Sequence, residues 1–121
     1  MKLKKYSYNV VKSTNDVSFR KIRSNSSQGA IISNNQTIGR GRYGKKWISI
    51  KGNLFVSFFY ELKNINLSLS VITKINCLLV KKLIENNYKK KIVYKKPNDL
   101  LIKGKKICGI LQEIINKQNQ K

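Results

Sequence analysis

The chain has 121 residues, a formal net charge of +21 at pH 7 and a hydrophobic content of 40%. These values are typical of one folded domain and exclude a disordered chain. The absence of histidine and the presence of only two cysteines exclude a histidine-based catalytic triad, a zinc site and a disulfide scaffold. No apolar run is long enough to span a bilayer and no signal peptide is recognisable, so we expect a cytoplasmic protein with no membrane partner.

The first half of the chain predicts strands and one short helix. Residues 6–11 have the pattern of a strand, and the cap residues 13–16 predict a helix over residues 15–23. Aromatic and β-branched side chains predict strand at residues 47–50 and again at residues 54–62. Because the second of these segments is apolar at both odd and even positions, we expect it to form a central strand covered on both faces.

The second half predicts one long helix and a hairpin. Apolar side chains recur at spacings of three and four over residues 67–86, which predicts an amphipathic helix whose apolar stripe packs on the sheet as core. Residues 100–102 and 107–111 are expected to pair as strands, joined by residues 103–106. We therefore expect a single α+β domain over residues 1–121, with helices packed on a mixed β-sheet. The expected stripe consists of Val71, Ile72, Ile75, Leu78, Leu79 and Leu83.

A loop rich in glycine and arginine follows Gln36. Three glycines and two arginines lie within residues 39–44, and glycine lets the backbone approach a ligand closely. Arg40 and Arg42 carry planar guanidinium groups that can bind the oxygens of a carboxylate or phosphate in pairs. The loop therefore predicts a negatively charged ligand. The alternative is a surface loop that is basic only because the whole chain is basic.

Two nucleotide-binding fingerprints overlap this loop. Gly39, Gly41 and Gly44 have the spacing of a dinucleotide-binding fingerprint, but residues typical of a strand follow where a helix should begin. The spacing also approaches that of a P-loop, yet Lys46 stands where a Ser or Thr hydroxyl would bind Mg²⁺. The residues therefore argue against both kinds of site.

The only proline lies in a second polar segment. Pro97 presets its own φ angle and holds the preceding residue in an extended conformation. We therefore expect Asn98 and Asp99 to project at a strand end, where a ligand crevice is commonly found. The alternative is an Asx turn in which these side chains satisfy only the neighbouring backbone.

Together these segments resemble the catalytic domain of biotin protein ligases, over about residues 7–115. That family has a Ser-Thr-Asn, a Gln before a G-R-G-R-x-G loop, a Trp soon after it, a K-W-P-N-D segment and a lysine-containing strand that ends in G-I-L. The chain departs from the pattern at Lys96, where the family has Trp, and at Tyr43, where Arg is usual. The family continues with further strands and a small C-terminal β-domain, and we expect both to be missing here. The matching residues are Ser13, Thr14, Asn15, Gln36, residues 39–44, Trp47, residues 95 and 97–99, and residues 105–111.

The resemblance implies an incomplete biotin/lipoate ligase-like core, similar to class II synthetases, and an ATP-dependent biotin ligase. Such enzymes join biotin to ATP as biotinyl-5′-AMP and then transfer the biotinyl group to a lysine of a biotin carboxyl carrier protein. Biotin, ATP, Mg²⁺ and the carrier protein are therefore the expected ligands and partners, and a homodimer is compatible with the resemblance. No helix-turn-helix precedes residue 7, so we expect no specific DNA binding.

The resemblance also implies a role for each matching residue. Arg40 and Arg42 would hold the biotin carboxylate and the α-phosphate, and Trp47 would stack near the adenine. Lys106 would stabilise charge on the α-phosphate with support from Lys95, although a solvated lysine in a hairpin is the alternative for Lys106. The implied biotin-binding residues are Ser13, Thr14, Asn15, Gln36, Arg40, Gly41, Arg42 and Lys106. The implied ATP-binding residues are Gly39, Arg40, Arg42, Trp47, Asn98 and Asp99, with Asp99 also a Mg²⁺ ligand; the implied catalytic residues are Lys106, Arg42 and Lys95.

Three other functions stay open. The chain could be a non-catalytic remnant of the same domain, or an acyltransferase similar to lipoate ligases. It could also be a basic protein that binds nucleic acids non-specifically, because lysines that neutralise phosphates give salt-dependent affinity. The lysines are scattered along every segment and accompany abundant Asn and Ile, so biased base composition also explains the charge.

Overall fold

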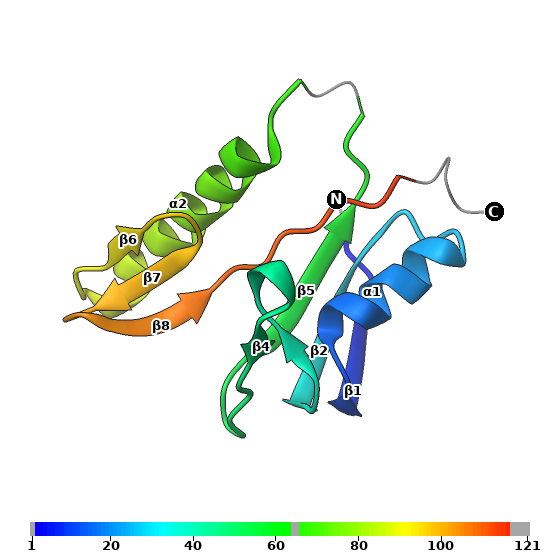
Figure 1. Cartoon of the computed structure of the whole chain (residues 1–121), viewed down its shortest axis with the longest axis horizontal. Coiled ribbons are helices and arrows are strands. Elements are labelled where there is room, and N and C mark those ends of the chain that lie inside the picture. Colours follow the sequence, from blue (N-terminus) through cyan, green and yellow to red (C-terminus); the bar gives the residue numbers. More distant parts are fainter. Residues whose placement is uncertain (1, 64–65, 117–121) are drawn as a thin grey trace. The chain divides into compact units, whose positions relative to one another are not determined.

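The computed structural model describes residues 2–63 and 66–116, in which the chain forms two compact units. Unit 1 contains residues 2–63 with residues 115 and 116, and unit 2 contains residues 66–114. Each unit has a small core of its own. Figure 1 shows the helices and strands of the chain. The expectation of one domain over the whole chain stays a prediction, and the polar tail after residue 116 lies outside the described residues.

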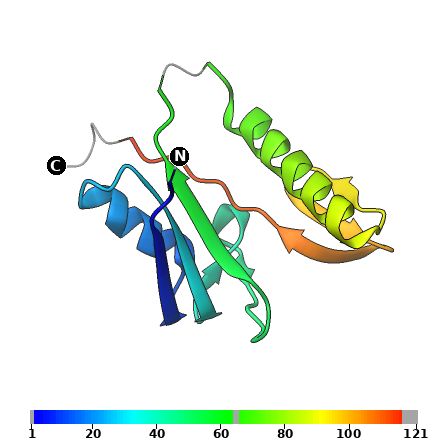
Figure 2. The ribbon, with the colours of Figure 1, turned by 180° about the vertical axis from the view of Figure 1, so that it is seen from behind.

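Unit 1 is built on a sheet with the strand order β1-β2-β5. Strand β1 (Lys5–Val11) runs parallel to β2 (Gln28–Gln36), helix α1 (Thr14–Arg23) connects the two, and β5 (Phe55–Tyr60) pairs with β2 in the antiparallel direction. Such a crossover places the C-terminal ends of β1 and β2 side by side, with Val11 opposite Gln36. Figures 1 and 2 show α1 lying along one face of this sheet.

Helix α1 confirms the predicted helix and its cap. The side-chain oxygen of Ser13 accepts a hydrogen bond from the backbone N–H of Asp16 at 3.3 Å, which satisfies one of the first N–H groups of the helix. The inner side of the helix contributes Val17 to the core of unit 1, where it joins Ile31 and Phe59. The helix is therefore fixed at its start by a cap and along its length by burial.

Strand β5 lies at the end of the strand order, so the prediction of a central strand covered on both faces is wrong. Its side chains alternate, with Phe55, Ser57 and Phe59 buried. Phe58 is 61% exposed, and Tyr60 is also exposed. Because the outer face carries aromatic residues instead of polar ones, the alternation that marks a strand with one exposed face was not visible in the sequence.

A short hairpin connects β2 to β5. Strand β3 (Gly39–Arg40) pairs with β4 (Lys46–Trp47), and the 3-10 turn η1 (Arg42–Gly44) lies between them. The predicted strand at residues 47–50 is confirmed only at Trp47, and Ile48 is exposed. Since β3 has only two residues, it offers no backbone partner beyond Trp47.

Unit 2 packs helix α2 (Leu69–Tyr88) on an antiparallel sheet with the order β6-β7-β8. The strands are β6 (Val93–Lys95), β7 (Asp99–Ile102) and β8 (Lys105–Gly109). The predicted long helix and the predicted hairpin are confirmed. The hairpin loop is only Lys103 and Gly104, whose φ values of 49° and 77° suit the tight turn that a twisted hairpin prefers.

The apolar stripe predicted for α2 is wrong in most of its residues. Of the six residues expected in the core, only Ile72 is buried, and Leu79 and Leu83 are 61% and 63% exposed. The face that packs on the sheet instead presents Cys77, with Val80 and Ile84 beside it in the core of unit 2. The helix is apolar on two sides, so the spacing of its apolar residues does not reveal which side is buried.

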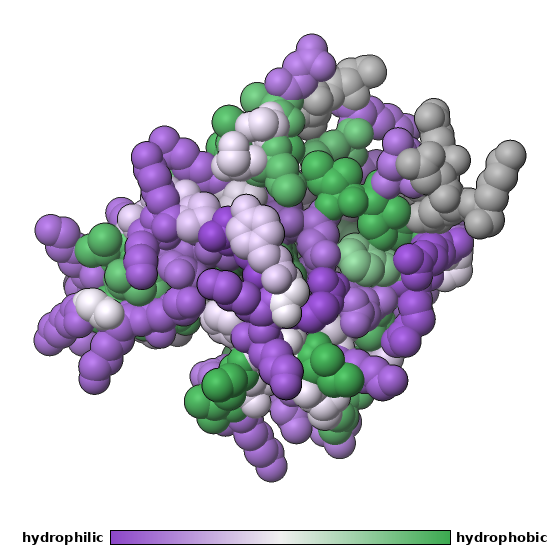
Figure 3. Space-filling model, viewed as in Figure 1, coloured by the Kyte–Doolittle hydropathy of each residue, from purple (hydrophilic) through white to green (hydrophobic). Residues whose placement is uncertain are grey.

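The surface carries hydrophilic and hydrophobic groups together. Hydrophilic side chains cover much of the face shown in Figure 3, with hydrophobic patches between them. In the part of the chain that the structure describes, neither α1 nor α2 is both long and apolar enough to cross a membrane.

Candidate functional site

The end of strand β2 and the start of helix α1 form a polar corner in unit 1. The side-chain oxygen of Gln36 accepts a hydrogen bond from the backbone N–H of Thr14 at 2.9 Å, and the Thr14 hydroxyl lies 3.4 Å from the same oxygen. Thr14 is the first residue of the helix, where backbone N–H groups have no partner within the helix. Two residues predicted for the biotin site, 22 positions apart in the sequence, are therefore in direct contact.

Gln36 also holds the segment after the hairpin. Its side-chain Nε2 donates to the hydroxyl of Ser49 at 3.0 Å. Gly39 leaves room for this bond, because a Cβ atom at that position would lie 2.7 Å from Gln36 Nε2 and 2.8 Å from Ser49 Oγ. Ser49 was not predictable from the sequence, since a serine in an irregular segment carries no signal of its own.

A second hydroxyl completes the corner from strand β5. Ser57 is buried, and its hydroxyl donates to Thr14 Oγ1 at 2.7 Å and also bonds the side-chain oxygen of Asn15. A hydroxyl carries one proton, so Ser57 can donate to only one of these oxygens at a time. Ser57 was not among the predicted site residues either, although a serine on the buried face of an apolar strand is a usable signal.

Ser13 acts as the predicted helix cap. Its side-chain oxygen caps helix α1, and the residue is only 3% exposed. The cap places Thr14 and Asn15 in the first turn of the helix, facing Gln36 and Ser57. A direct bond from Ser13 to biotin stays a prediction, because the hydrogen bond that Ser13 makes in this structure is the helix cap.

The two arginines of the loop lie in different surroundings. Arg40 forms an ion pair with Asp16 at 2.8 Å and stacks over the ring of Phe19, with 5.7 Å from its Cζ to the ring centroid. Arg42 lies in the 3-10 turn with its Cζ 5.0 Å from the ring centroid of Tyr43. The loop is closed at its base by the hydrogen bond of 2.7 Å from the Gly41 N–H to the Lys45 carbonyl.

Trp47 lies in strand β4 directly opposite Gly39. The Trp47 carbonyl oxygen is 2.8 Å from the place that a Cβ atom on Gly39 would occupy, so only glycine fits without movement. The predicted members of the site in unit 1 are thus joined through one hydrogen-bonded hairpin and the polar corner beside it. The stacking of Trp47 on adenine stays a prediction.

In unit 2, Lys106 and Asp99 form an ion pair of 3.3 Å between strands β8 and β7. A bulge makes this contact possible. Leu100 pairs with Cys108, but Leu101 pairs with Lys106, so Ile107 is an extra residue in β8. In a regular strand Lys106 and Cys108 would share a face; here Cys108 packs toward the core and Lys106 lies on the opposite face with Asp99.

Lys95 shares this outward face. It pairs with Asp99 across strands β6 and β7, and residues directly opposite each other point to the same side of a sheet. Leu100, the next residue after Asp99, is fully buried in the core with Cys77 of helix α2. The structure therefore places three of the predicted residues of unit 2 on the sheet face that points away from α2.

Asn98 is anchored across the sheet. Its side-chain Nδ2 donates to the backbone carbonyl of Ile110 at 3.0 Å, and its backbone carbonyl accepts the N–H of Ile110 at 3.0 Å. The alternative of an Asx turn that satisfies only neighbouring backbone is therefore wrong for Asn98, because its partner lies 12 residues away. Close by, the Tyr94 hydroxyl donates to the Pro97 carbonyl at 2.7 Å, which ties down the segment before Asn98.

The two cysteines are free thiols in unit 2. Burial raises the pKa of Cys77, and burial together with the nearby Asp99 carboxylate raises the pKa of Cys108. A raised pKa keeps a thiol protonated at neutral pH, which disfavours nucleophilic chemistry. Cys77 is buried, whereas Cys108 is only partly buried.

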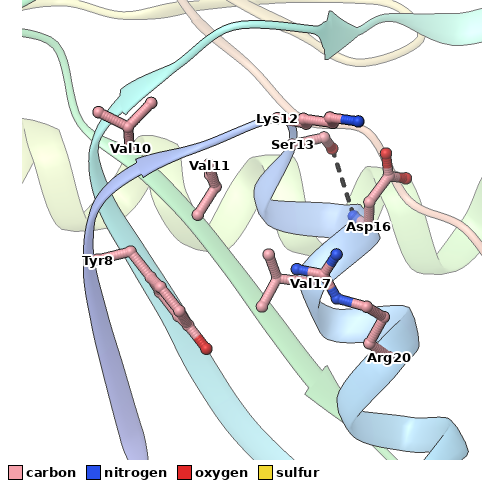
Figure 4. Close-up of a pocket in the computed structure, with 8 residues that line it drawn as sticks. All are labelled: Tyr8, Val10, Val11, Lys12, Ser13, Asp16, Val17 and Arg20. Atoms are coloured by element: carbon pink, nitrogen blue, oxygen red, sulfur yellow. Dashed lines mark hydrogen bonds between the residues drawn. The ribbon is translucent and has the colours of Figure 1, made fainter.

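A cavity of about 310 Å³ lies beside the polar corner, between strand β1 and helix α1 (Figure 4). Lys12 and Arg20 line it together with Asp16, and Tyr8 lies on the strand side. Of the predicted ligand-binding residues, only Ser13 is among its lining residues, and its side chain is occupied by the helix cap. Thr14, Gln36 and Ser57 of the polar corner do not line this cavity, and neither does any residue of the glycine–arginine loop (residues 39–44), although the lining residue Asp16 pairs with Arg40.

The predicted site residues thus fall into two groups, each within one unit. The group in unit 1 joins Thr14, Asn15 and Gln36 to the glycine–arginine loop, and the group in unit 2 joins Asp99 to Lys106. The two groups belong to different units, and the ligands assigned to each residue stay predictions.

The sequence and the fold can be compared with known proteins. The sequence model of the biotin/lipoate A/B protein ligase family matches residues 7–121. The bifunctional ligase/repressor BirA of Escherichia coli (strain K12) is 38% identical over 114 residues, which cover 89% of this chain and 34% of BirA. The BirA of Salmonella typhimurium is 36% identical over the same coverage. The chain spans about a third of the length of these curated relatives.

The similar solved structures agree with the family match. The biotin protein ligase from Aquifex aeolicus in complex with biotin and ATP is 29% identical, with a TM-score of 0.79 over 92% of this chain and 47% of that chain. The biotin acetyl coenzyme A carboxylase synthetase from Helicobacter pylori, with bound biotinylated ATP, has a TM-score of 0.80 at 23% identity over 94% of this chain and 56% of that chain, and supports the fold alone. The fold is the α+β fold of biotin protein ligase catalytic cores. Since the family match covers nearly the whole sequence, the chain belongs to the biotin/lipoate A/B protein ligase family.

Proposed function

We propose that this chain acts as an ATP-dependent biotin–protein ligase. It would join biotin to ATP as biotinyl-5′-AMP and then transfer the biotinyl group to a lysine of a biotin carboxyl carrier protein. The observation that carries the proposal is the contact of Gln36 with both Thr14 and Ser49, directly beside the glycine–arginine loop. Family membership and the biotin and ATP bound to the Aquifex aeolicus ligase support it.

The polar corner of unit 1 suits the ureido ring of biotin. That ring is neutral, with two N–H donors and one carbonyl acceptor. Thr14, Gln36 and Ser57 offer neutral donors and acceptors within hydrogen-bonding distance of one another, and a ligand of this kind would exchange with their mutual bonds. Burying an unpaired charge in this corner would cost free energy. Because the side chains here are neutral, the corner favours a neutral heterocycle over a charged group.

The cationic residues suit the other end of biotin and the triphosphate. In the first step a carboxylate oxygen of biotin attacks the α-phosphorus of ATP, the bond to the β-phosphate oxygen breaks, and pyrophosphate leaves. Negative groups must approach each other, so fixed cations and alignment contribute more than an acid or base. We assign Arg42 to the biotin carboxylate and α-phosphate, and Lys106 with Lys95 to the phosphate oxygens.

Asp99 suits Mg²⁺ as an ion shared with the nucleotide. In the described ranges, 2–63 and 66–116, no group of three His, Cys, Asp or Glu residues could hold a metal. Asp99 supplies one carboxylate that is already paired with Lys106. Mg²⁺ is commonly bound by one or two carboxylates together with substrate phosphates. Asp99 would hold it there, and the ion would neutralise charge on the triphosphate.

In the second step the amine of the acceptor lysine attacks the carbonyl carbon of biotinyl-5′-AMP, AMP leaves with the bonding electrons, and the amine loses a proton. Water must be kept from the mixed anhydride, and closure of the glycine–arginine loop would exclude it. A biotin carboxyl carrier protein as acceptor, a homodimer and the cytoplasm as the compartment are parts of the same proposal.

Isothermal titration with biotin, in the presence and absence of ATP and Mg²⁺, tests the proposal. Saturable biotin binding at physiological salt, with formation of biotinyl-5′-AMP and pyrophosphate by mass spectrometry, supports a ligase. Biotin binding without product supports a non-catalytic remnant, and preferential use of lipoate supports the related acyltransferase. Affinity for nucleic acid alone, falling steeply with added salt, would contradict the proposal.

A further inference from the structure

One ion pair connects the glycine–arginine loop to helix α1. The Arg40 guanidinium lies 2.8 Å from Asp16 Oδ1, and it also stacks over the ring of Phe19. Asp16 and Phe19 are three residues apart in the helix, so they lie on the same side of it. Arg40 is thus held at two points on one helix face, by charge and by an aromatic ring.

Arg40 is also part of the base of the loop. It pairs with Lys46 across the short β3–β4 hairpin, and its neighbour Gly41 donates to the Lys45 carbonyl at 2.7 Å. The residues of the turn, including Arg42, therefore project from a base whose position Arg40 sets. A contact that fixes Arg40 on α1 also fixes the place from which Arg42 reaches a ligand.

The same turn of α1 serves the polar corner. Thr14 donates to Gln36, and Asp16, two residues later, binds Arg40. The first turn of α1 consequently sets the distance between the neutral corner and the cationic loop. A ligand with a neutral ring at one end and a carboxylate at the other needs that distance to be fixed before it binds, because ordering a loop on binding costs affinity.

We propose that Asp16 is a positioning residue, which holds Arg40 on helix α1 and so orders the glycine–arginine loop before ligand arrives. The inference rests on the proposed function for the identity of the ligand. Arg40 then serves mainly to anchor the loop, and Arg42 meets the carboxylate. The opposite relationship would be competition, in which the Asp16 carboxylate occupies Arg40 until the ligand displaces it.

A readout without ligand tests the anchor directly. Trp47 is the only tryptophan and lies opposite Gly39 in the hairpin, so its fluorescence reports on the base of the loop. Asp16→Asn and Arg40→Gln should each increase acrylamide quenching of Trp47 and lower its anisotropy, and Asp16→Glu should restore most of the native values. The control Glu61→Gln removes one carboxylate from the same unit and should leave both values unchanged. In the Arg40→Gln background, Asp16→Asn should cause no further change in the quenching or anisotropy of Trp47, because Asp16 acts through Arg40.

Titration of the same variants with biotin measures how each substitution changes the affinity for biotin. Asp16→Asn should weaken biotin binding by about two- to fivefold, the range expected when one partly exposed ion pair is lost. Unchanged Trp47 quenching, or an equal effect in the Arg40→Gln background, would overturn the inference. Tighter biotin binding by Asp16→Asn would also overturn it, in favour of competition. If the native chain binds no biotin, the proposed function fails, and the quenching measurements still decide whether Asp16 holds the loop.

Discussion

The side-chain oxygen of Gln36 accepts the backbone N–H of Thr14 at 2.9 Å, and so joins the end of strand β2 to the first residue of helix α1. The other end of the same amide donates to Ser49. The side-chain amide of Gln36 consequently has a fixed orientation, because its oxygen faces a donor and its nitrogen faces a hydroxyl. Any group that displaces this amide disturbs the helix start and the hairpin together.

Gly39→Ala should disturb the hairpin and the Gln36 amide. A Cβ atom there would lie 2.7 Å from Gln36 Nε2 and 2.8 Å from the Trp47 carbonyl, closer than van der Waals contact allows. We expect a loss of about 1–3 kcal/mol in the free energy of unfolding of unit 1, measured by urea titration with Trp47 fluorescence. Gly41→Ala is the matched control, because its nearest neighbours would be 3.6 Å away. Equal stability of the two variants would contradict the steric explanation.

Lys106→Ala should reduce formation of biotinyl-5′-AMP by about 10²–10³-fold, the usual effect of removing one group that stabilises transition-state charge. The measurement is biotin-dependent exchange of labelled pyrophosphate into ATP. Lys105→Ala is the control, since Lys105 has the same charge and is the preceding residue of the same strand. Circular dichroism should show that both variants remain folded. Equal exchange rates in both variants would remove Lys106 from the proposed chemistry.

Two substitutions test which side of helix α2 is buried. Leu100→Ala changes strand β7, which packs on the inner side of the helix, and Leu79→Ala changes the helix itself. Leu100 is fully buried against the inner side, whereas Leu79 is 61% exposed on the other. Leu100→Ala should lower the free energy of unfolding by about 2–5 kcal/mol. Leu79→Ala should change it by about 0.5 kcal/mol or less, as expected for an exposed position. Urea titration monitored by circular dichroism measures both, and a larger loss for Leu79→Ala would mean that the other side of α2 is the buried one.

Unit 2 should lose stability in acid through Glu85. A hydrogen bond from the Ile92 N–H, and then the Lys81 ammonium at 2.9 Å, hold the pKa of Glu85 below its ordinary value. A lowered pKa gives stability that is complete above the pKa of the unfolded chain and is lost as pH falls through the folded value. Hydrogen exchange of the Ile92 amide should therefore accelerate in acid, relative to its intrinsic rate. Glu85→Gln should show weaker dependence of this protection on pH, and an unchanged dependence would rule out Glu85 as its source.

Local features could be predicted from the sequence because their causes lie within a few residues. The Ser13 cap acts on Asp16 three residues later, and the hairpin turn lies within the loop predicted at residues 103–106, although it takes only two of those residues. The motif residues were also readable, and the family match agrees with the resemblance they carried. The pairing of Lys106 with Asp99 was not predictable, because it depends on a bulge whose position is set by two strands together.

The amino-acid sequence by itself determined where the helices and the hairpin form, which residues carry the family pattern, and that the loop after Gln36 is cationic. Only the tertiary structure decided that α2 buries Cys77 instead of Leu79, that β5 ends the strand order among the described residues, and that Ser49 and Ser57 complete the polar corner. The physical reason is that periodicity and capping act between near neighbours in the chain. The choice between two apolar faces, and the partner of a lone hydroxyl, depend on surfaces contributed by residues distant in the sequence.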